Sequence, residues 1–159
     1  MTKLHKIIAT GLGTGYVPFA PGTAGSVLGI ILLFGFNKWL EHSGYTLDEM
    51  ALINLVVIVL VLLIGVYAIK NIHKIWQHDA SEIVIDEIVG VWIAALFIPI
   101  KWQYYLYALL LFRFFDIVKP FFIRKLDDKS SDWSVMLDDV LAGIYSLVVI
   151  QVLYHFELI

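Results

Sequence analysis

The chain contains no cysteine and little charge, and each shortage excludes a class of function. Without cysteine it has no disulfide framework, thiol nucleophile or zinc–thiolate site. Charged residues make up 16% of its 159 residues and hydrophobic residues 60%, whereas a typical soluble domain is about 25% charged. The net charge of −3 and the lack of a basic stripe argue against a nucleic-acid partner. The composition therefore predicts an integral membrane protein.

Several common catalytic signatures are missing as well. The glycine-rich stretch at residues 11–26 contains no Gly-Lys-Ser/Thr sequence of a Walker A loop. The five histidines are scattered, without the paired spacing of a zinc site. The chain also lacks the Ser-Gly-His sequence of acid-phosphatase-like lipid phosphatases. Together with the missing cysteine, this argues against both common covalent phosphatase chemistries.

The hydrophobic residues gather in segments that are separated by polar turns. The segment at residues 51–69 carries no charge over 19 positions and is the clearest transmembrane helix. Five glycines and two prolines at residues 11–26 predict an irregular loop before the first segment. We expect an all-α membrane bundle of about five membrane-embedded helices in a single domain, residues 1–159. The five segments are residues 27–40, 51–69, 83–100, 104–119 and 135–156.

The distribution of lysine and arginine predicts the orientation of this bundle. If the N-terminus is cytoplasmic, eight of these residues fall on the cytoplasmic side and two on the other side. Basic residues favour cytoplasmic loops, so we expect the N-terminus inside and the C-terminus outside. The cytoplasmic set is Lys3, Lys6, Lys70, Lys74, Lys119, Arg124, Lys125 and Lys129, and the outer pair is Lys38 and Lys101. On each side lie tryptophans that suit an interface, among them Trp39 and Trp102 outside and Trp76 and Trp133 inside.

Acidic residues interrupt three of the apolar segments. Asp86 and Glu87 lie in the third, Asp116 in the fourth, and Asp138 and Asp139 at the start of the fifth. A carboxylate at the centre of a membrane helix costs about 2.5–3.5 kcal/mol on insertion scales, so such residues usually have a role. The predicted orientation places all five near the cytoplasmic surface, where they could offer oxygen ligands to Mg²⁺. The alternative is that acidic residues at a helix start complement the helix dipole.

Basic and hydroxyl side chains provide a second group of candidates. Arg113, Asp116 and Lys119 follow a three-residue spacing and would share one helix face. They could form a phosphate clamp around a catalytic or metal-binding carboxylate, or only a self-neutralising ladder of ion pairs. The loop before the first segment could present backbone N–H groups with the hydroxyls of Thr23 and Ser26 to an anion. Its alternative is a flexible re-entrant turn.

Four motifs follow one another between residues 11 and 143. They are Pro18-x-x-Pro21-Gly22-Thr23-x-Gly25-Ser26, Asp79-x-Ser81-x-x-Val84-x-Asp86-Glu87-x-Val89-Gly90, Phe112-Arg113-x-Phe115-Asp116-x-x-Lys119-Pro120 and Met136-Leu137-Asp138-Asp139-Val140-x-Ala142-Gly143. In this order they resemble the phosphatidylglycerophosphatase A family. Two positions depart from the family pattern: Ala80 replaces a proline, and residues 131–134 replace a Gly-Gly pair, while no carboxylate is lost.

The resemblance implies a Mg²⁺-dependent enzyme of the bacterial inner membrane with its active site facing the cytoplasm. Such an enzyme would convert phosphatidylglycerophosphate to phosphatidylglycerol and phosphate. We therefore assign candidate roles to nine residues. The catalytic candidates are Asp86, Glu87, Asp116 and Asp139; the substrate-binding candidates are Thr23, Ser26, Arg113 and Lys119; the Mg²⁺ candidates are Asp86, Glu87, Asp138 and Asp139.

Two questions stay open at this point. The phosphate ester could be attacked by a water activated by Mg²⁺ or by an aspartate, Asp116 or Asp86, through a phosphoenzyme. The chain could instead be an ion- or proton-coupled transporter, which also uses intramembrane carboxylates, or an assembly subunit without chemistry. Transporters tend to place such residues at the midplane and to contain repeated halves, and this chain has no visible repeat.

A shared spacing predicts how two of the helices pack. Asp86 and Gly90 are four residues apart, and so are Asp139 and Gly143. Residues four apart share a helix face, and glycine on a membrane helix lets another backbone approach closely. We expect the third and fifth segments to pack through these glycines, so that Asp86 faces Asp139 while Asp138 points aside.

Overall fold

The computed structural model describes residues 2–73, 80–120, 123 and 132–159, and all regular structure in these residues is helical. This confirms the all-α prediction. A short 3₁₀ turn, Thr14–Tyr16, links the first two α-helices. The α-helices are α1 Thr2–Ala9, α2 Pro21–His42, α3 Leu47–Ile72, α4 Ile85–Ala94, α5 Trp102–Val118 and α7 Asp132–His155.

Three of these helices are long and apolar enough to cross a membrane, namely α2, α3 and α7. α3 starts at a capping box in which Thr46 and Glu49 satisfy each other's backbone N–H groups. α5 has 17 residues, at the lower limit for a span. α4 has only ten residues, or about 15 Å. Five full spans are therefore not confirmed, because the third segment forms a helix over only half of its length.

The early end of α4 has a local cause. Pro99 lacks the N–H group that a continuing helix would direct to the carbonyl of Ala95. The chain leaves the helix and Phe97 takes a positive φ of 58°. Backbone carbonyls at membrane depth need internal partners, and α7 provides one. The side-chain amide of Gln151 donates to the carbonyl oxygens of Leu96 and Phe97 at 3.3 and 3.1 Å.

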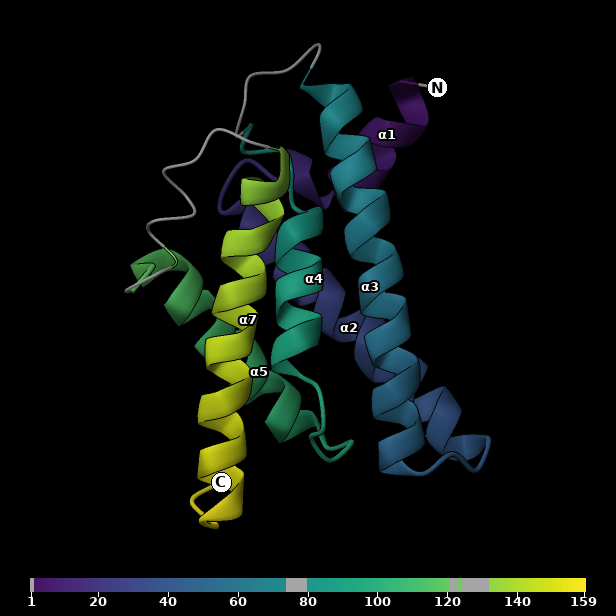
Figure 1. Ribbon diagram of the computed structural model, residues 1–159, viewed down its shortest axis with the longest axis vertical. Coiled ribbons are helices and arrows are strands. Elements are labelled where there is room, and N and C mark those ends of the chain that lie inside the picture. Colours follow the sequence, from purple (N-terminus) through teal and green to yellow (C-terminus); the bar gives the residue numbers. More distant parts are fainter. Residues whose placement is uncertain (1, 74–79, 121–122, 124–131) are drawn as a thin grey trace.

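α4 lies at the centre of the bundle and contacts α2, α3, α5 and α7 (Figure 1). Val89 and Val91 in α4, and Val84 just before its start, are completely buried. The indole N–H of Trp92 donates to the carbonyl oxygen of Gly29 on α2 at 2.7 Å, which ties these two helices together. The two chain ends lie at opposite ends of the long axis (Figure 1). The orientation across the membrane stays a prediction.

The loop predicted at residues 11–26 is shorter than expected. α2 already begins at Pro21, because proline suits the first position of a helix. Gly25 and Gly29 then face α4, where a Cβ on Gly25 would come within 2.7 Å of the Val84 side chain. The glycines that suggested a loop thus serve close helix packing instead. The irregular conformation is confined to the residues before Pro21, where Ala20 has a φ of 52°.

Some of the predictions concern residues outside the described ranges. Ser131, the first residue of the loop that departs from the family pattern, lies outside them, and the next residue already begins α7. The other such residues are Lys74, Trp76, Asp79, Arg124, Lys125 and Lys129.

Candidate active site

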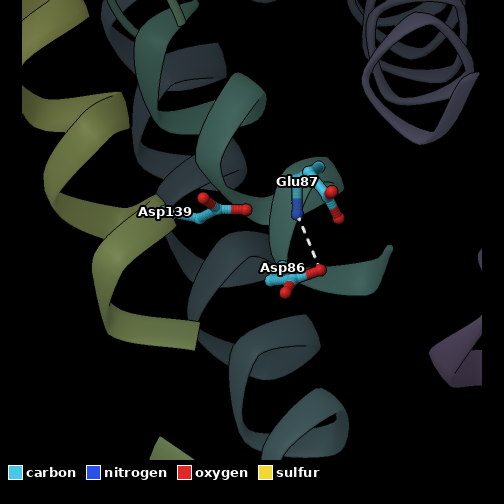
Figure 2. A group of neighbouring side chains, drawn as sticks. All are labelled: Asp86, Glu87 and Asp139. Carbon is cyan, nitrogen blue, oxygen red and sulfur yellow. Dashed lines mark hydrogen bonds between the residues drawn. The ribbon is translucent and has the colours of Figure 1, made fainter. Parts of the chain in front are cut away.

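Three carboxylates converge between α4 and α7. Asp86, Glu87 and Asp139 each offer an oxygen, and these oxygens lie within 4.8 Å of one another. Figure 2 shows Asp139 reaching from α7 toward the α4 pair. The backbone N–H of Glu87 donates to Oδ1 of Asp86 at 3.1 Å and fixes that carboxylate. Asp86 and Asp139 are buried, and Glu87 is half-buried.

The two glycines predicted to join these helices do so. A Cβ built on Gly143 would collide with the carbonyl oxygen of Gly90. A Cβ built on Gly90 would lie 2.7 Å from the carbonyl oxygen of Asp139 and would also collide with the Phe112 ring. The backbones of α4 and α7 therefore touch one helical turn away from Asp86 and Asp139. The predicted packing is confirmed, and it explains why two residues 53 positions apart share one site.

The observed helix starts change which of the acidic residues a helix dipole can stabilise. α7 begins at Asp132, so Asp138 and Asp139 lie well inside it, beyond the first turn where a helix dipole acts. Asp86 and Glu87 occupy the first turn of α4. The dipole can therefore help to hold the α4 pair, but it does not account for the aspartates of α7.

Asp138 is paired with a lysine and is not one of the three converging carboxylates. Its Oδ2 lies 2.9 Å from Nζ of Lys119, and its side chain is 9% exposed. The structure thus brings together three of the four predicted metal ligands and pairs the fourth with a lysine. This agrees with the expectation that Asp138 points aside.

Lys119 does not occupy the helix face that its spacing predicted. α5 ends at Val118, and Lys119 takes the left-handed conformation with φ 44°. Pro120 disfavours a helical residue before it, so the chain turns at this point. The turn lets Lys119 pair with Asp138 on α7, so the expectation that Arg113, Asp116 and Lys119 share one helix face is wrong for Lys119.

Arg113 and Asp116, which are three residues apart on α5, form an ion pair. Nη1 of Arg113 lies 2.6 Å from Oδ2 of Asp116, and both side chains are mostly buried, 18% and 14% exposed. Nε of Arg113 and Oε2 of Glu87 are buried atoms without a hydrogen-bond partner among the described residues. The carboxylate of Asp139 interacts electrostatically with both Asp116 and Glu87. The ion pair and the three converging carboxylates therefore belong to one site.

The start of α2 closes this site from a third side, through a residue that the sequence reasoning left without a role. A Cβ on Gly22 would collide with Oε1 of Glu87 and lie 3.1 Å from Nη1 of Arg113. The Pro21-Gly22 pair could have identified this position as the start of a closely packed helix. Pro21 has no N–H group, and the N–H groups that follow it in the first turn of α2 receive no hydrogen bond from an N-cap side chain.

The two hydroxyl candidates differ in their surroundings. Ser26 is completely buried, and its hydroxyl donates to the carbonyl oxygen of Gly22 at 2.8 Å. It therefore holds the first turn of α2 beside Glu87. Thr23 is half-buried in the same turn. The structure gives Ser26 a positioning contact and leaves Thr23 nearer to solvent.

The site has more negative than positive groups. Among the described residues, its ion pairs match Asp116 with Arg113 and Asp138 with Lys119. Three carboxylates remain close together in the group of Figure 2. Carboxylate oxygens are the ligands that Mg²⁺ prefers. Oε2 of Glu87 has no hydrogen-bond partner among the described residues, so this oxygen can serve as a metal ligand. The residues present therefore fit a divalent cation.

Comparison with known proteins gives matches over nearly the whole length of this chain. The family described as Phosphatidylglycerophosphatase A matches residues 7–154. A Bacteroides thetaiotaomicron protein named "Putative phosphatidylinositol-3-phosphatase" is 41% identical, covering 94% of this chain and 92% of its own length. Proteins named Phosphatidylglycerophosphatase A from Haemophilus influenzae and Escherichia coli are 39% and 32% identical, covering 99% and 98% of this chain and 93% and 86% of their own lengths. No solved structure gives a significant match.

Proposed function

The chain belongs to the phosphatidylglycerophosphatase A family and is an enzyme, a phosphatase; we propose that it removes the terminal phosphate of phosphatidylglycerophosphate in a Mg²⁺-dependent reaction. The product would be phosphatidylglycerol. The single observation that carries this proposal is the convergence of three carboxylates beside an arginine and a helix start. The family match gives no support to the alternative of an ion-coupled transporter.

Asp86, Glu87 and Asp139 would hold the metal. A bound Mg²⁺ would neutralise charge on the phosphoryl oxygens and activate a water. The salt bridge between Lys119 and Asp138 supports this arrangement from outside, because it fixes α5 against α7 beside Asp139. Groups that orient metal ligands typically change metal affinity or activity about 10–100-fold when removed.

The phosphate would be bound on the side of α2 and α5. Arg113 is already held by Asp116 at 2.6 Å, so its guanidinium is oriented before substrate arrives. Its Nε has no hydrogen-bond partner among the described residues and is available to an anion. The uncapped N–H groups at the start of α2 would add donors to the same anion. We favour attack by water over a phosphoenzyme because Asp116 is engaged by Arg113, and Asp86 by the backbone of Glu87.

The reaction would take place at the cytoplasmic surface of the bacterial inner membrane. The proposal rests on the charge distribution of the sequence, which places the α2 start, the α4 start and the α5 end on the side of the N-terminus. A phospholipid substrate could then reach the site by lateral movement within one leaflet.

The 41% identical relative named "Putative phosphatidylinositol-3-phosphatase" suggests a second candidate substrate, phosphatidylinositol 3-phosphate. Both candidate substrates carry a phosphomonoester on a phospholipid headgroup. The inositol ring is bulkier than glycerol, so the two differ in what must fit between α2 and α5. The same site could process either, and a comparison of kcat/KM decides between them.

The decisive experiment measures phosphate release by the purified protein in mixed micelles, with each lipid, with Mg²⁺ and with a chelator. We expect Mg²⁺-dependent turnover of phosphatidylglycerophosphate that disappears in Asp86→Asn. Glu41→Gln is a matched control, since Glu41 is an exposed carboxylate that pairs with Lys38. Release that continues unchanged in the chelator would refute the metal assignment, and no release from either lipid would refute the function.

A further inference from the structure

An apolar groove lies between the end of α5 and the middle of α7. It has a volume of about 530 Å³ and an entirely apolar lining, within the range of about 300–1,000 Å³ that small-molecule pockets occupy. Phe114 and Val118 on α5 and Val148 on α7 each leave about half of their surface exposed there, 55%, 54% and 56%. Phe115 and Tyr145 form its floor, with ring centroids 5.8 Å apart in a T-shaped arrangement.

One end of the groove meets the charged site. Val118 immediately precedes Lys119, and Nζ of Lys119 lies 2.9 Å from Oδ2 of Asp138. The lysine side chain is still 27% exposed. A molecule that fills the groove would therefore place one end near the partly accessible ammonium group of Lys119.

From this end the groove follows α7 in the direction away from Asp138. At 1.5 Å per residue, Tyr145 lies about 10 Å and Val148 about 15 Å beyond Asp138 along the axis of α7. Half of a bilayer's hydrocarbon core is also about 15 Å thick. The α7 residues that line the groove lie between positions 144 and 149, so this side begins about 9 Å beyond Asp138 and spans about 8 Å of helix axis. A groove of this length fits within one leaflet.

We propose that this groove binds an acyl chain of the phospholipid substrate and so holds its phosphate at the carboxylates. The inference rests on the proposed lipid phosphatase activity and adds a binding site for the tail. The occupant must be apolar where it lies in the groove and anionic at the charged end, and a phospholipid phosphomonoester has this polarity in this order. Ordinary membrane lipid would fill the groove without preference for the charged end.

The first test fills the groove with Val148→Trp. Its control is Val59→Trp on α3, because Val59 is exposed to a similar extent, 48%, and does not line the groove. kcat/KM is measured for dioleoyl and dihexanoyl phosphatidylglycerophosphate. We expect Val148→Trp to lower kcat/KM at least tenfold for the dioleoyl lipid, mainly through KM, and to change it less than twofold for the dihexanoyl lipid. Val59→Trp should affect neither. Equal effects of the two variants on the dioleoyl lipid, or equal losses on both lipids, would overturn the proposal.

The second test does not depend on turnover. A non-hydrolysable phosphonate analogue with a photoreactive diazirine in its acyl chain is incorporated into phosphatidylcholine vesicles with the wild-type protein. We expect crosslinks at residues 114–118 and 144–149 that excess unlabelled phosphonate suppresses and excess phosphatidylcholine does not. Equal suppression by both lipids would identify the occupant as ordinary membrane lipid. Crosslinks in the expected place without any phosphatase activity would separate a failure of the proposed function from a failure of the groove.

Discussion

Gly90→Ala is expected to disturb the metal site without touching a carboxylate. A Cβ at this position would lie 2.7 Å from the carbonyl oxygen of Asp139, and 3.4 Å is the lower limit of ordinary contact, so the backbones must separate by about 0.7 Å. The ring of Phe112 blocks relaxation on the other side, since it is completely buried. Mg²⁺ requires near-ideal octahedral geometry at about 2.0–2.1 Å and tolerates such a displacement poorly.

We expect Gly90→Ala to raise the Mg²⁺ concentration for half-maximal activity about 10–100-fold, as for other changes that misplace metal ligands. Overpacking should also cost about 1–3 kcal/mol of stability. Calorimetric titration with Mg²⁺ and thermal unfolding in detergent measure the two effects separately. Gly35→Ala is the control, because nothing lies within 4 Å of its Cβ position and alanine favours a helix by up to about 1 kcal/mol. Unchanged Mg²⁺ affinity in Gly90→Ala would refute the claim that α4–α7 contact sets the site geometry.

Three further outcomes are expected. Asp139→Asn should abolish Mg²⁺-dependent phosphate release, whereas Asp138→Asn should lose only about 10–100-fold; the reverse order would show that the helix phase is wrong. Because the chain has no native cysteine, single cysteines can test the topology. We expect an impermeant thiol reagent to label His155→Cys and not Ser81→Cys in intact cells, and the opposite pattern would place the site on the outer face. Tyr105→Phe should cost about 1–3 kcal/mol in thermal unfolding, because the buried Tyr105 hydroxyl accepts a hydrogen bond from an asparagine amide at 2.7 Å; an unchanged unfolding temperature would contradict this.

The carboxylate site could be predicted where its geometry is periodic within one helix. The Asp86–Gly90 and Asp139–Gly143 spacings repeat at four residues, which fixes the direction of each side chain relative to the packing glycine. That local rule was enough to place Asp86 opposite Asp139 and to turn Asp138 away from them. It required no knowledge of the connecting segments.

Features that depend on helix ends were not predictable in the same way. Pro120 indicates that the helix ends near Lys119, but the sequence does not show that the turn brings Lys119 to Asp138 on α7. Pro99 gives α4 a local reason to end early, but the partner of the freed carbonyls is Gln151, more than 50 positions further along. No local pattern contains a tertiary partner of this kind.

Because α4 is only about half as long as the predicted segment, the free-energy cost of placing Asp86 and Glu87 in the membrane differs from that expected for a full span. In a full span covering residues 83–100 they would lie about a turn inside the helix, where a carboxylate enters the membrane without a helix start to support it. In the structure they occupy the first turn of a short buried helix, where its dipole favours negative charge by up to about 1–2 kcal/mol. Asp139 has no such support in the interior of α7, and the carboxylates of Asp86 and Glu87, with oxygens within 4.8 Å, repel its charge. It is therefore the member of the group whose charge most requires a cation, which is the physical reason to expect the metal between α4 and α7 and not at the α4 start alone.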